Sequence, residues 1–245
     1  MSEQIRGKTA IVTGGSKGIG YGIARALTAA GANVAISARS ADEVQVAARE
    51  LAEQGGGRVV GIPCDVRRAE DVQRLVEETV RELGSLDILI NNAGVGAFGS
   101  VEELSVEKWD QVIETNLSGV FYCCHAAIPH LRESGDAWII NIASLAGKNA
   151  FAGGAAYNAS KFGLVGFSEA LMMDVRHDGI RVNYIMPGSV NTDFSGPGGS
   201  HSEQRETAWM IQPEDIAKLV MDLLSMHSRA LPSRIEVRPS QPPKK

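Results

Sequence analysis

A serine, a tyrosine and a lysine stand between residues 144 and 161, and their side chains suit proton transfer. Tyr157 and Lys161 are four positions apart, so on a helix they share one face about 6 Å apart. The pKa of a free tyrosine hydroxyl is about 10, which is too high for efficient proton exchange at neutral pH. We expect the Lys161 ammonium to favour the phenolate and lower that pKa. Ser144 follows an apolar run and is placed to hydrogen-bond a substrate oxygen.

A glycine-rich turn follows the first apolar run and precedes an amphipathic stretch. It reads Thr-Gly-Gly-Ser-Lys-Gly-Ile-Gly over residues 13–20. Glycines let backbone N–H groups approach a pyrophosphate, which the positive end of the next helix stabilises. The order of strand, turn and helix favours a dinucleotide site over a tight turn without a ligand. The candidate residues are Gly14, Ser16, Lys17, Gly18, Ile19 and Gly20.

The second predicted strand ends without an acidic residue. NAD-binding sites usually carry an acid about twenty residues after the turn, for the ribose 2′-hydroxyl. Here the tip of the strand carries Arg39, whose guanidinium can hold a 2′-phosphate through two hydrogen bonds. Lys17 in the glycine turn adds a second cation. Both can instead be solvated surface cations, but the pattern favours NADP(H) over NAD(H).

Apolar, β-branched runs alternate with amphipathic stretches along the chain, which is typical of repeated βαβ units. The sequence therefore predicts a single-domain Rossmann fold over residues 1–245, with a doubly wound, parallel, seven-stranded sheet and helices on both faces. Two segments break the pattern: 193–212, which we interpret as a substrate lid, and the tail 239–245, which we expect to be flexible. The predicted strands are 8–12, 33–38, 58–62, 86–91, 138–143, 181–186 and 233–237, and the predicted helices are 18–30, 41–54, 69–83, 105–131, the one carrying Tyr157 to about 177, and one from 213.

Composition excludes several classes of protein. The net charge of -5 argues against nucleic acid or an anionic membrane as a partner. No apolar run approaches the roughly 18 residues of a membrane span, and the first residues lack the layout of a signal peptide. Cys64, Cys123 and Cys124 suit neither a disulfide framework nor a metal site with the histidines. We therefore expect no metal, and a reduced, cytoplasmic setting.

With these residues in view, the sequence resembles the short-chain dehydrogenase/reductase family over nearly its whole length. The glycine turn matches the family's T-G-x-x-x-G-x-G, and residues 91–94 match its N-N-A-G. Residues 187–192 match its P-G-x-V-x-T, and Asp65-Val66 matches its adenine-contacting pair. Asn116 matches the family's helical asparagine, and Ser144, Tyr157 and Lys161 match its active-site serine and Y-x-x-x-K.

The resemblance implies a role for each matching residue. Tyr157 would be the general acid that protonates a carbonyl oxygen, and the base in the reverse direction. Lys161 would lower the pKa of Tyr157 and hold the nicotinamide ribose, while Ser144 would orient the carbonyl and Asn116 would hold a water that links Lys161 to solvent. The cofactor-binding residues implied by the other motifs are Asp65 and Val66 at the adenine, Asn92, Ala93 and Gly94 at the adenosine ribose, and Pro187, Gly188, Val190 and Thr192 beside the nicotinamide, with Val190 and Thr192 at the carboxamide.

Substrate and partners are less constrained by the sequence. Within the family the chain looks most like the bacterial 3-oxoacyl-(acyl-carrier-protein) reductases, but residues 131–136 lack their basic cluster and the C-terminus lacks their D-G-G-like turn. A homodimer is therefore as consistent as the family's tetramer. Phe194, Trp209 and Met210 are candidates either for an apolar substrate wall or for packing within the lid. The competing interpretation is a non-catalytic dinucleotide sensor or scaffold, although all four catalytic positions are present.

Overall fold

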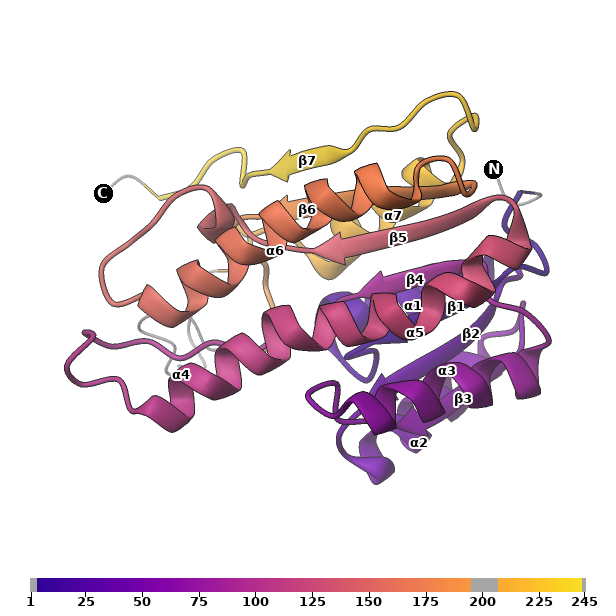
Figure 1. Cartoon of the computed structure of the whole chain (residues 1–245), viewed down its shortest axis with the longest axis horizontal. Coiled ribbons are helices and arrows are strands. Elements are labelled where there is room, and N and C mark those ends of the chain that lie inside the picture. Colours follow the sequence, from indigo (N-terminus) through magenta and orange to yellow (C-terminus); the bar gives the residue numbers. More distant parts are fainter. Residues whose placement is uncertain (1–3, 195–206, 244–245) are drawn as a thin grey trace.

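The computed structural model describes residues 4–194 and 207–243. Seven strands form one sheet in the order β3-β2-β1-β4-β5-β6-β7 (Figure 1), and every neighbouring pair is parallel. The predicted fold class is therefore confirmed. The strands are β1 Thr9–Thr13, β2 Asn33–Ala38, β3 Val59–Pro63, β4 Ile88–Asn91, β5 Ala137–Ile142, β6 Ile180–Pro187 and β7 Arg234–Val237. The helices are α1 Gly18–Ala29, α2 Ala41–Glu53, α3 Ala69–Leu83, α4 Val106–Ile113, α5 Gly119–Ser134, α6 Ala155–Val175 and α7 Pro213–Leu224, with the short η1 Glu114–Ser118 and η2 Leu145–Gly147.

Alternation along the strands builds two apolar cores, one on each face of the sheet. In β1, Ile11 belongs to the core beneath α3, α5 and α6, whereas its neighbour Val12 belongs to the core beneath α1, α2 and α7. Successive side chains of a strand point to opposite faces, so both must be apolar in a sheet covered on both sides. Every residue of β1 and of β5 is buried accordingly.

One predicted helix is interrupted. The sequence pattern predicts a continuous helix over 105–131, but a turn of π-helix at Glu114–Ser118 separates α4 from α5. Asn116 lies in this turn and is completely buried, and its side chain hydrogen-bonds the backbone of Val95 in the loop after β4. Hydrophobic periodicity cannot reveal such a turn, because the apolar face continues through it.

The strand order reverses between β1 and β4, which are neighbours in the sheet. Doubly wound sheets bind ligands at the carboxyl ends of the strands, beside this reversal. These ends point to the left in Figure 1, toward α4 and the amino-terminal end of α6. The glycine turn and the loops after β4, β5 and β6 all meet there. No helix in the part of the chain that the structure describes is both long and apolar enough to cross a membrane.

Candidate active site

The predicted proton-transfer pair lies on the first two turns of α6. Lys161 is buried, and its Nζ donates a hydrogen bond of 2.9 Å to the main-chain oxygen of Ile142 at the end of β5. The same Nζ lies 5.8 Å from the centroid of the Tyr157 ring. Lys161 forms no ion pair within the described ranges. A buried cation without a carboxylate is costly, and such groups concentrate at functional sites.

The direction expected for the pKa of Tyr157 is wrong for this structure. Burial raises the pKa of the Tyr157 hydroxyl above its ordinary value, and the hydrogen bond with the Ser144 side chain only partly opposes it. Burial also lowers the pKa of Lys161 from 10.5 to about 8. Desolvation disfavours the charged form of both groups, and it sets the direction of the shift for Tyr157. A protonated tyrosine remains the form required of an acid.

Ser144 lies directly after β5 and begins the short helix η2. Its Oγ accepts a hydrogen bond of 3.1 Å from the Ala146 N–H. Asn158, next to Tyr157 and buried, fixes this loop: its Nδ2 donates to the oxygens of Ala146 and Asn149. Sequence analysis missed this positioning role, because an asparagine beside a tyrosine on a helix carries no distinctive signal.

Asn116 connects the π-helical turn to the loop after β4. Its Nδ2 donates to the Val95 oxygen and to Ser160 Oγ, and its Oδ1 accepts from the Val95 N–H. Both amide hydrogens are therefore used, and only the remaining lone pair of Oδ1 can receive a hydrogen bond from water. A Cβ built on Gly94 would lie 3.4 Å from this Oδ1 and 3.9 Å from Lys161 Nζ, so these three residues converge at one point.

The glycine turn leads into α1 with its amino end open. Gly14 and Gly18 have positive φ angles of 63° and 57°, which glycine adopts without strain. A Cβ on Gly20 would meet the Gly14 oxygen at 2.3 Å. The first turn of α1 has neither a side-chain cap nor an acidic residue, so its N–H groups remain available to an anion. Ser16 is half-buried in the turn, while Ile19 packs against the core.

The loop after β4 supports this turn. Asn92 Nδ2 donates to the oxygens of Thr13 and Gly14, at 2.9 and 3.0 Å, while Thr13 Oγ1 accepts from the N–H groups of Asn92 and Ala93. The Asn92 amide is thus committed to the glycine turn. Contact of Asn92, Ala93 and Gly94 with a ribose stays a prediction.

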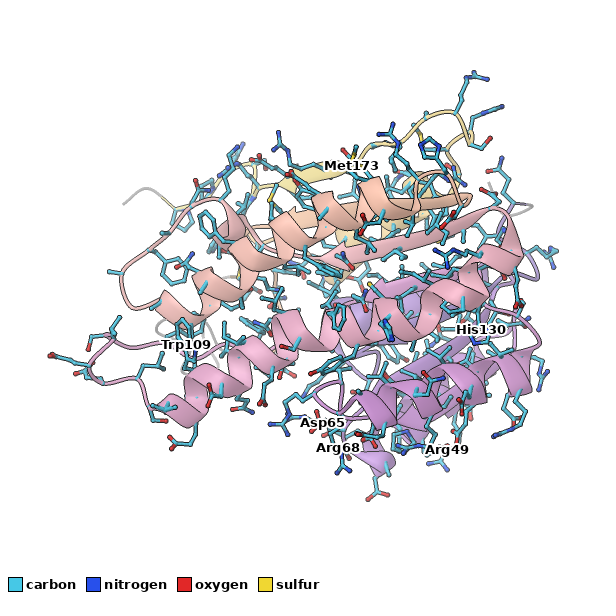
Figure 2. All side chains as sticks on the ribbon, in the orientation of Figure 1. Arg49, Asp65, Arg68, Trp109, His130 and Met173 are labelled. Atoms are coloured by element: carbon cyan, nitrogen blue, oxygen red, sulfur yellow. The ribbon has the colours of Figure 1, made fainter. Side chains whose placement is uncertain are left out.

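The two predicted phosphate-binding cations, Arg39 and Lys17, are exposed. In the described part of the chain neither has an ion-pair partner. By contrast, Arg67 holds the Asp65 carboxylate at 2.6 Å and so lowers the pKa of Asp65. Val66 is buried in the core. Figure 2 shows Asp65 and Arg68 together near the start of α3, well separated from Trp109 on α4.

The segment after β6 lies opposite the glycine turn. Pro187 ends β6, and the N–H of Gly188 donates to the Val237 oxygen at 2.8 Å. Val190 forms a parallel bridge with Ile211. The Cγ2 methyl of Thr192 would lie 3.3 Å from a Cβ on Gly18, so this segment and the glycine turn lie across from each other.

The aromatic neighbours of Tyr157 were only partly predicted. Phe194 packs against the Tyr157 ring, with the ring centroids 5.6 Å apart. This contact places Phe194 beside the proposed catalytic residue, where a substrate wall would lie. Trp209 and Met210 are half-buried, and the rest of the predicted lid, residues 195–206, lies outside the described residues. Phe98, which also contacts the Tyr157 ring, and Phe151 were missed, because single phenylalanines in loops have no spacing to mark them.

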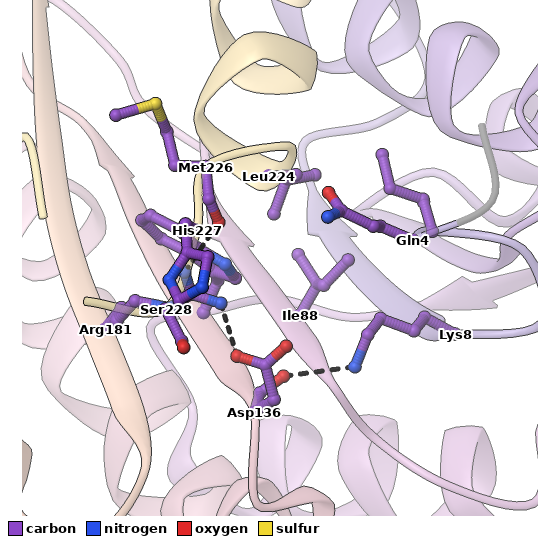
Figure 3. Close-up of a pocket in the computed structure, with 11 residues that line it drawn as sticks. Gln4, Lys8, Ile88, Asp136, Arg181, Leu224, Met226, His227 and Ser228 are labelled. Atoms are coloured by element: carbon purple, nitrogen blue, oxygen red, sulfur yellow. Dashed lines mark hydrogen bonds and ion pairs between the residues drawn. The ribbon is translucent and has the colours of Figure 1, made fainter. Parts of the chain in front are cut away.

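A cavity of about 280 Å³ lies at the opposite, amino ends of the strands (Figure 3). Arg181 pairs there with Asp136 and donates to the Met226 oxygen at 3.1 Å. Lys8 Nζ donates to the main-chain oxygen of Asp136. The charged groups Lys8, Asp136 and Arg181 are thus paired with one another or with the main chain, and the cavity lies at the end of the sheet opposite the Tyr157 site. Over the described ranges, no cluster of three or more His, Cys, Asp or Glu side chains could hold a metal ion.

Fold and site together define a dinucleotide-dependent oxidoreductase with a tyrosine–lysine pair. The short chain dehydrogenase family model matches residues 8–202, and the chain belongs to this family. It is 36% identical over 233 residues to a 3-oxoacyl-[acyl-carrier-protein] reductase of Chlamydia trachomatis, covering 92% of this chain and 93% of that protein. It is 37% identical over 228 residues to the D-threitol dehydrogenase of Mycolicibacterium smegmatis, covering 91% and 87%.

Two solved structures have the same fold. A metagenomic short-chain oxidoreductase in complex with NADP matches with a TM-score of 0.84 and 33% identity, over 98% of this chain and 100% of that one. An alcohol dehydrogenase from the archaeon Thermococcus sibiricus, complexed with 5-hydroxy-NADP, matches with a TM-score of 0.88 and 30% identity, over 97% and 99%.

Proposed function

We propose that this enzyme reversibly reduces a carbonyl to a secondary alcohol with NADP(H), with Tyr157 as the general acid and base. The observation that carries the proposal is the convergence of Tyr157, Ser144 and buried Lys161 at the carboxyl ends of the strands. The tyrosine is held protonated by burial, and the serine hydroxyl beside it suits a carbonyl oxygen as partner. Asn116 is proposed to complete a water-linked path to Lys161.

The residues of the nucleotide site fit NADP(H). The uncapped first turn of α1 and its crowded glycines suit a pyrophosphate. Arg39 and Lys17 form no ion pair within the described ranges. The relatives solved with NADP and 5-hydroxy-NADP support the same choice. When bound, the cofactor would supply the hydride. The protein's own work is then to orient the carbonyl with Ser144 and deliver a proton from Tyr157.

The test is NADPH oxidation with a panel of carbonyl compounds. The panel includes an acetoacetyl thioester, because the chain is similar to 3-oxoacyl-[acyl-carrier-protein] reductases. Tyr157→Phe is expected to lower kcat by roughly 10²- to 10⁴-fold, the usual worth of a general acid, with NADPH affinity nearly unchanged. Retained turnover in Tyr157→Phe would reject the assigned acid. NADPH binding without reduction of any carbonyl would instead indicate a non-catalytic sensor.

Assembly and location follow from the resemblance alone. A homodimer or homotetramer in the cytoplasm remains our proposal, and sedimentation of the purified protein would measure the oligomeric state.

A further inference from the structure

Three phenylalanines from three different loops line up with the Tyr157 ring. Phe98 follows β4, Phe151 follows β5 and Phe194 follows β6. The ring centroids of Phe98 and Tyr157 are 5.7 Å apart, those of Tyr157 and Phe194 are 5.6 Å apart, and those of Phe98 and Phe151 are 6.1 Å apart. The four rings are therefore in contact in the succession Phe151, Phe98, Tyr157 and Phe194, and we call them the aromatic row.

Glycines in the adjoining loops make room for this row. A Cβ on Gly96 would lie 2.7 Å from the Phe98 ring and 3.0 Å from the Phe194 ring. A Cβ on Gly154 would lie 2.5 Å from the Phe151 ring. Any other residue at either position would force the rings to shift, so the close approach of the rings depends on both glycines.

Backbone hydrogen bonds hold the loops of the row together. The Gly99 N–H donates to the Gly153 oxygen at 2.9 Å, which ties the Phe98 loop to the Phe151 loop. The Phe151 N–H donates to Oδ1 of Asn158 on α6. The aromatic row is thus a built feature of the catalytic end of the sheet.

The row has exposed aromatic surface, and among the described residues the cation nearest to it is the buried Lys161 behind the Tyr157 ring. The exposed fractions of Phe151 and Phe194, the two ends of the row, are 39% and 42%, so both rings leave surface free for a ligand. Lys148, on the loop between Ser144 and Phe151, is paired with Glu236 at 2.7 Å. Asp193, exposed beside Phe194, adds negative charge at this rim.

We infer that the substrate is an uncharged ketone with a planar aromatic group next to its carbonyl, and that Phe98, Phe151 and Phe194 select it. This inference rests on the proposed carbonyl reduction and adds the substrate class. Aromatic rings attract one another in offset or tilted arrangements beyond the gain from buried area. A carboxylate placed against the same rings would lose its hydration without gaining a partner.

The experiment compares ketones that differ in one property at a time. Acetophenone and cyclohexyl methyl ketone have similar size but only the first is aromatic, and acetoacetate and an acetoacetyl thioester complete the set. For the wild type with NADPH, we expect kcat/KM to be at least about tenfold higher for acetophenone than for acetoacetate, because the anion must be desolvated. Equal values, or a preference for acetoacetate or the thioester, would overturn the inference while leaving the proposed carbonyl reduction intact.

Substitutions in the aromatic row test whether its rings are the cause of the preference for an aromatic ketone. Phe98→Leu and Phe194→Leu should each lower kcat/KM for acetophenone by roughly three- to tenfold and that for cyclohexyl methyl ketone by less than about twofold, since only ring-specific attraction is removed. Phe162→Leu, at a similarly exposed phenylalanine of α6 that is not in the row, is the matched control and should change neither value. Equal losses on both ketones would overturn the inference.

A binding measurement separates this inference from the proposed function. Calorimetric titration of the NADP⁺-loaded enzyme with acetophenone should give saturable binding that Phe194→Leu weakens and Phe162→Leu does not. If no carbonyl is reduced, the proposed function fails, and this binding still decides the aromatic preference. Absence of binding, or equal binding of cyclohexyl methyl ketone, would overturn it.

Discussion

At the amino ends of the strands Arg181 pairs with Asp136, whereas at the carboxyl ends Lys161, Arg39 and Lys17 have no carboxylate partner among the described residues. The amino ends enclose a cavity of about 280 Å³, and the carboxyl ends carry the proposed catalytic residues. The state of the charges distinguishes them better than shape does. Cations that the fold leaves without carboxylates are available to an anionic ligand, while charges that neutralise one another stabilise the chain.

Replacing the buried Lys161 should have the largest effect and tests whether its unpaired charge serves catalysis at the expense of stability. Lys161→Met should lower kcat by about 10²-fold or more, because the tyrosine loses the cation beside it. The same variant should be more stable at pH 7. Burial of the charged Lys161, which lowers its pKa from 10.5 to about 8, destabilises the wild type by roughly 3 kcal/mol. The variant removes this cost, but it loses about 1–2 kcal/mol because the Ile142 oxygen no longer has a hydrogen-bond donor.

The sign of this effect can be checked with pH. Because the folded pKa of Lys161 lies below the unfolded value, the wild type binds fewer protons than its unfolded chain between pH 8 and 10.5. Its free energy of unfolding therefore gains from this residue as the pH rises through that window. The advantage of Lys161→Met, measured by urea unfolding, should shrink over the same range. A constant or growing advantage would contradict the burial cost assigned to Lys161.

Arg39 tests the open cations at the cofactor end. Arg39→Asp should lower the ratio of kcat/KM with NADPH to that with NADH by roughly 10- to 100-fold, because charge-assisted hydrogen bonds to a phosphate are worth about 1.5–3 kcal/mol. Arg49→Asp makes the same charge change at an exposed position of α2 and is the control. If both variants changed the ratio equally, general electrostatics and not a phosphate contact would explain the preference.

The pH profile sharpens the roles within the catalytic pair. The pKa of Tyr157 is raised and that of Lys161 is lowered to about 8. The kcat/KM for reduction should therefore be flat below pH 8 and then fall by up to about tenfold per unit as Lys161 loses its charge, while Tyr157 stays protonated. Ultraviolet titration of tyrosinate, wild type against Tyr157→Phe, should place the Tyr157 pKa above 10. A Tyr157 pKa near 7 would restore the interpretation from sequence spacing.

The fold and the positions of the proposed catalytic residues within it were predictable, because they depend on periodicity and on short motifs. Alternating β-branched runs marked all seven strands, and the spacing of Tyr157 and Lys161 placed both on α6. The pKa of Tyr157 was not predictable, since sequence spacing reports a neighbour's charge but not the solvent that both groups lose. The motif at residues 91–94 was recognisable, but the hydrogen-bond partner of Asn91 was not. Asn91 Nδ2 donates to Oδ1 of Asn141 on the neighbouring strand at 2.9 Å. That contact depends on strand register, which no local pattern encodes.

The opposite end of the sheet gives the smallest expected effect. Arg181 stacks on Trp138, with its guanidinium carbon 4.2 Å from the ring centroid, and the Arg181 side chain is only 11% exposed. Arg181→Met should lower the free energy of unfolding by about 1–2 kcal/mol through loss of the cation–π contact and the bond to the Met226 oxygen. The pairing with Asp136 adds little, because that carboxylate is half exposed. The Tm of Arg181→Lys should lie between those of the wild type and Arg181→Met, because lysine keeps the charge but lacks the planar guanidinium group. The kcat/KM of both variants should equal the wild-type value, and a change in it would show that the charges of this end do communicate with the catalytic one.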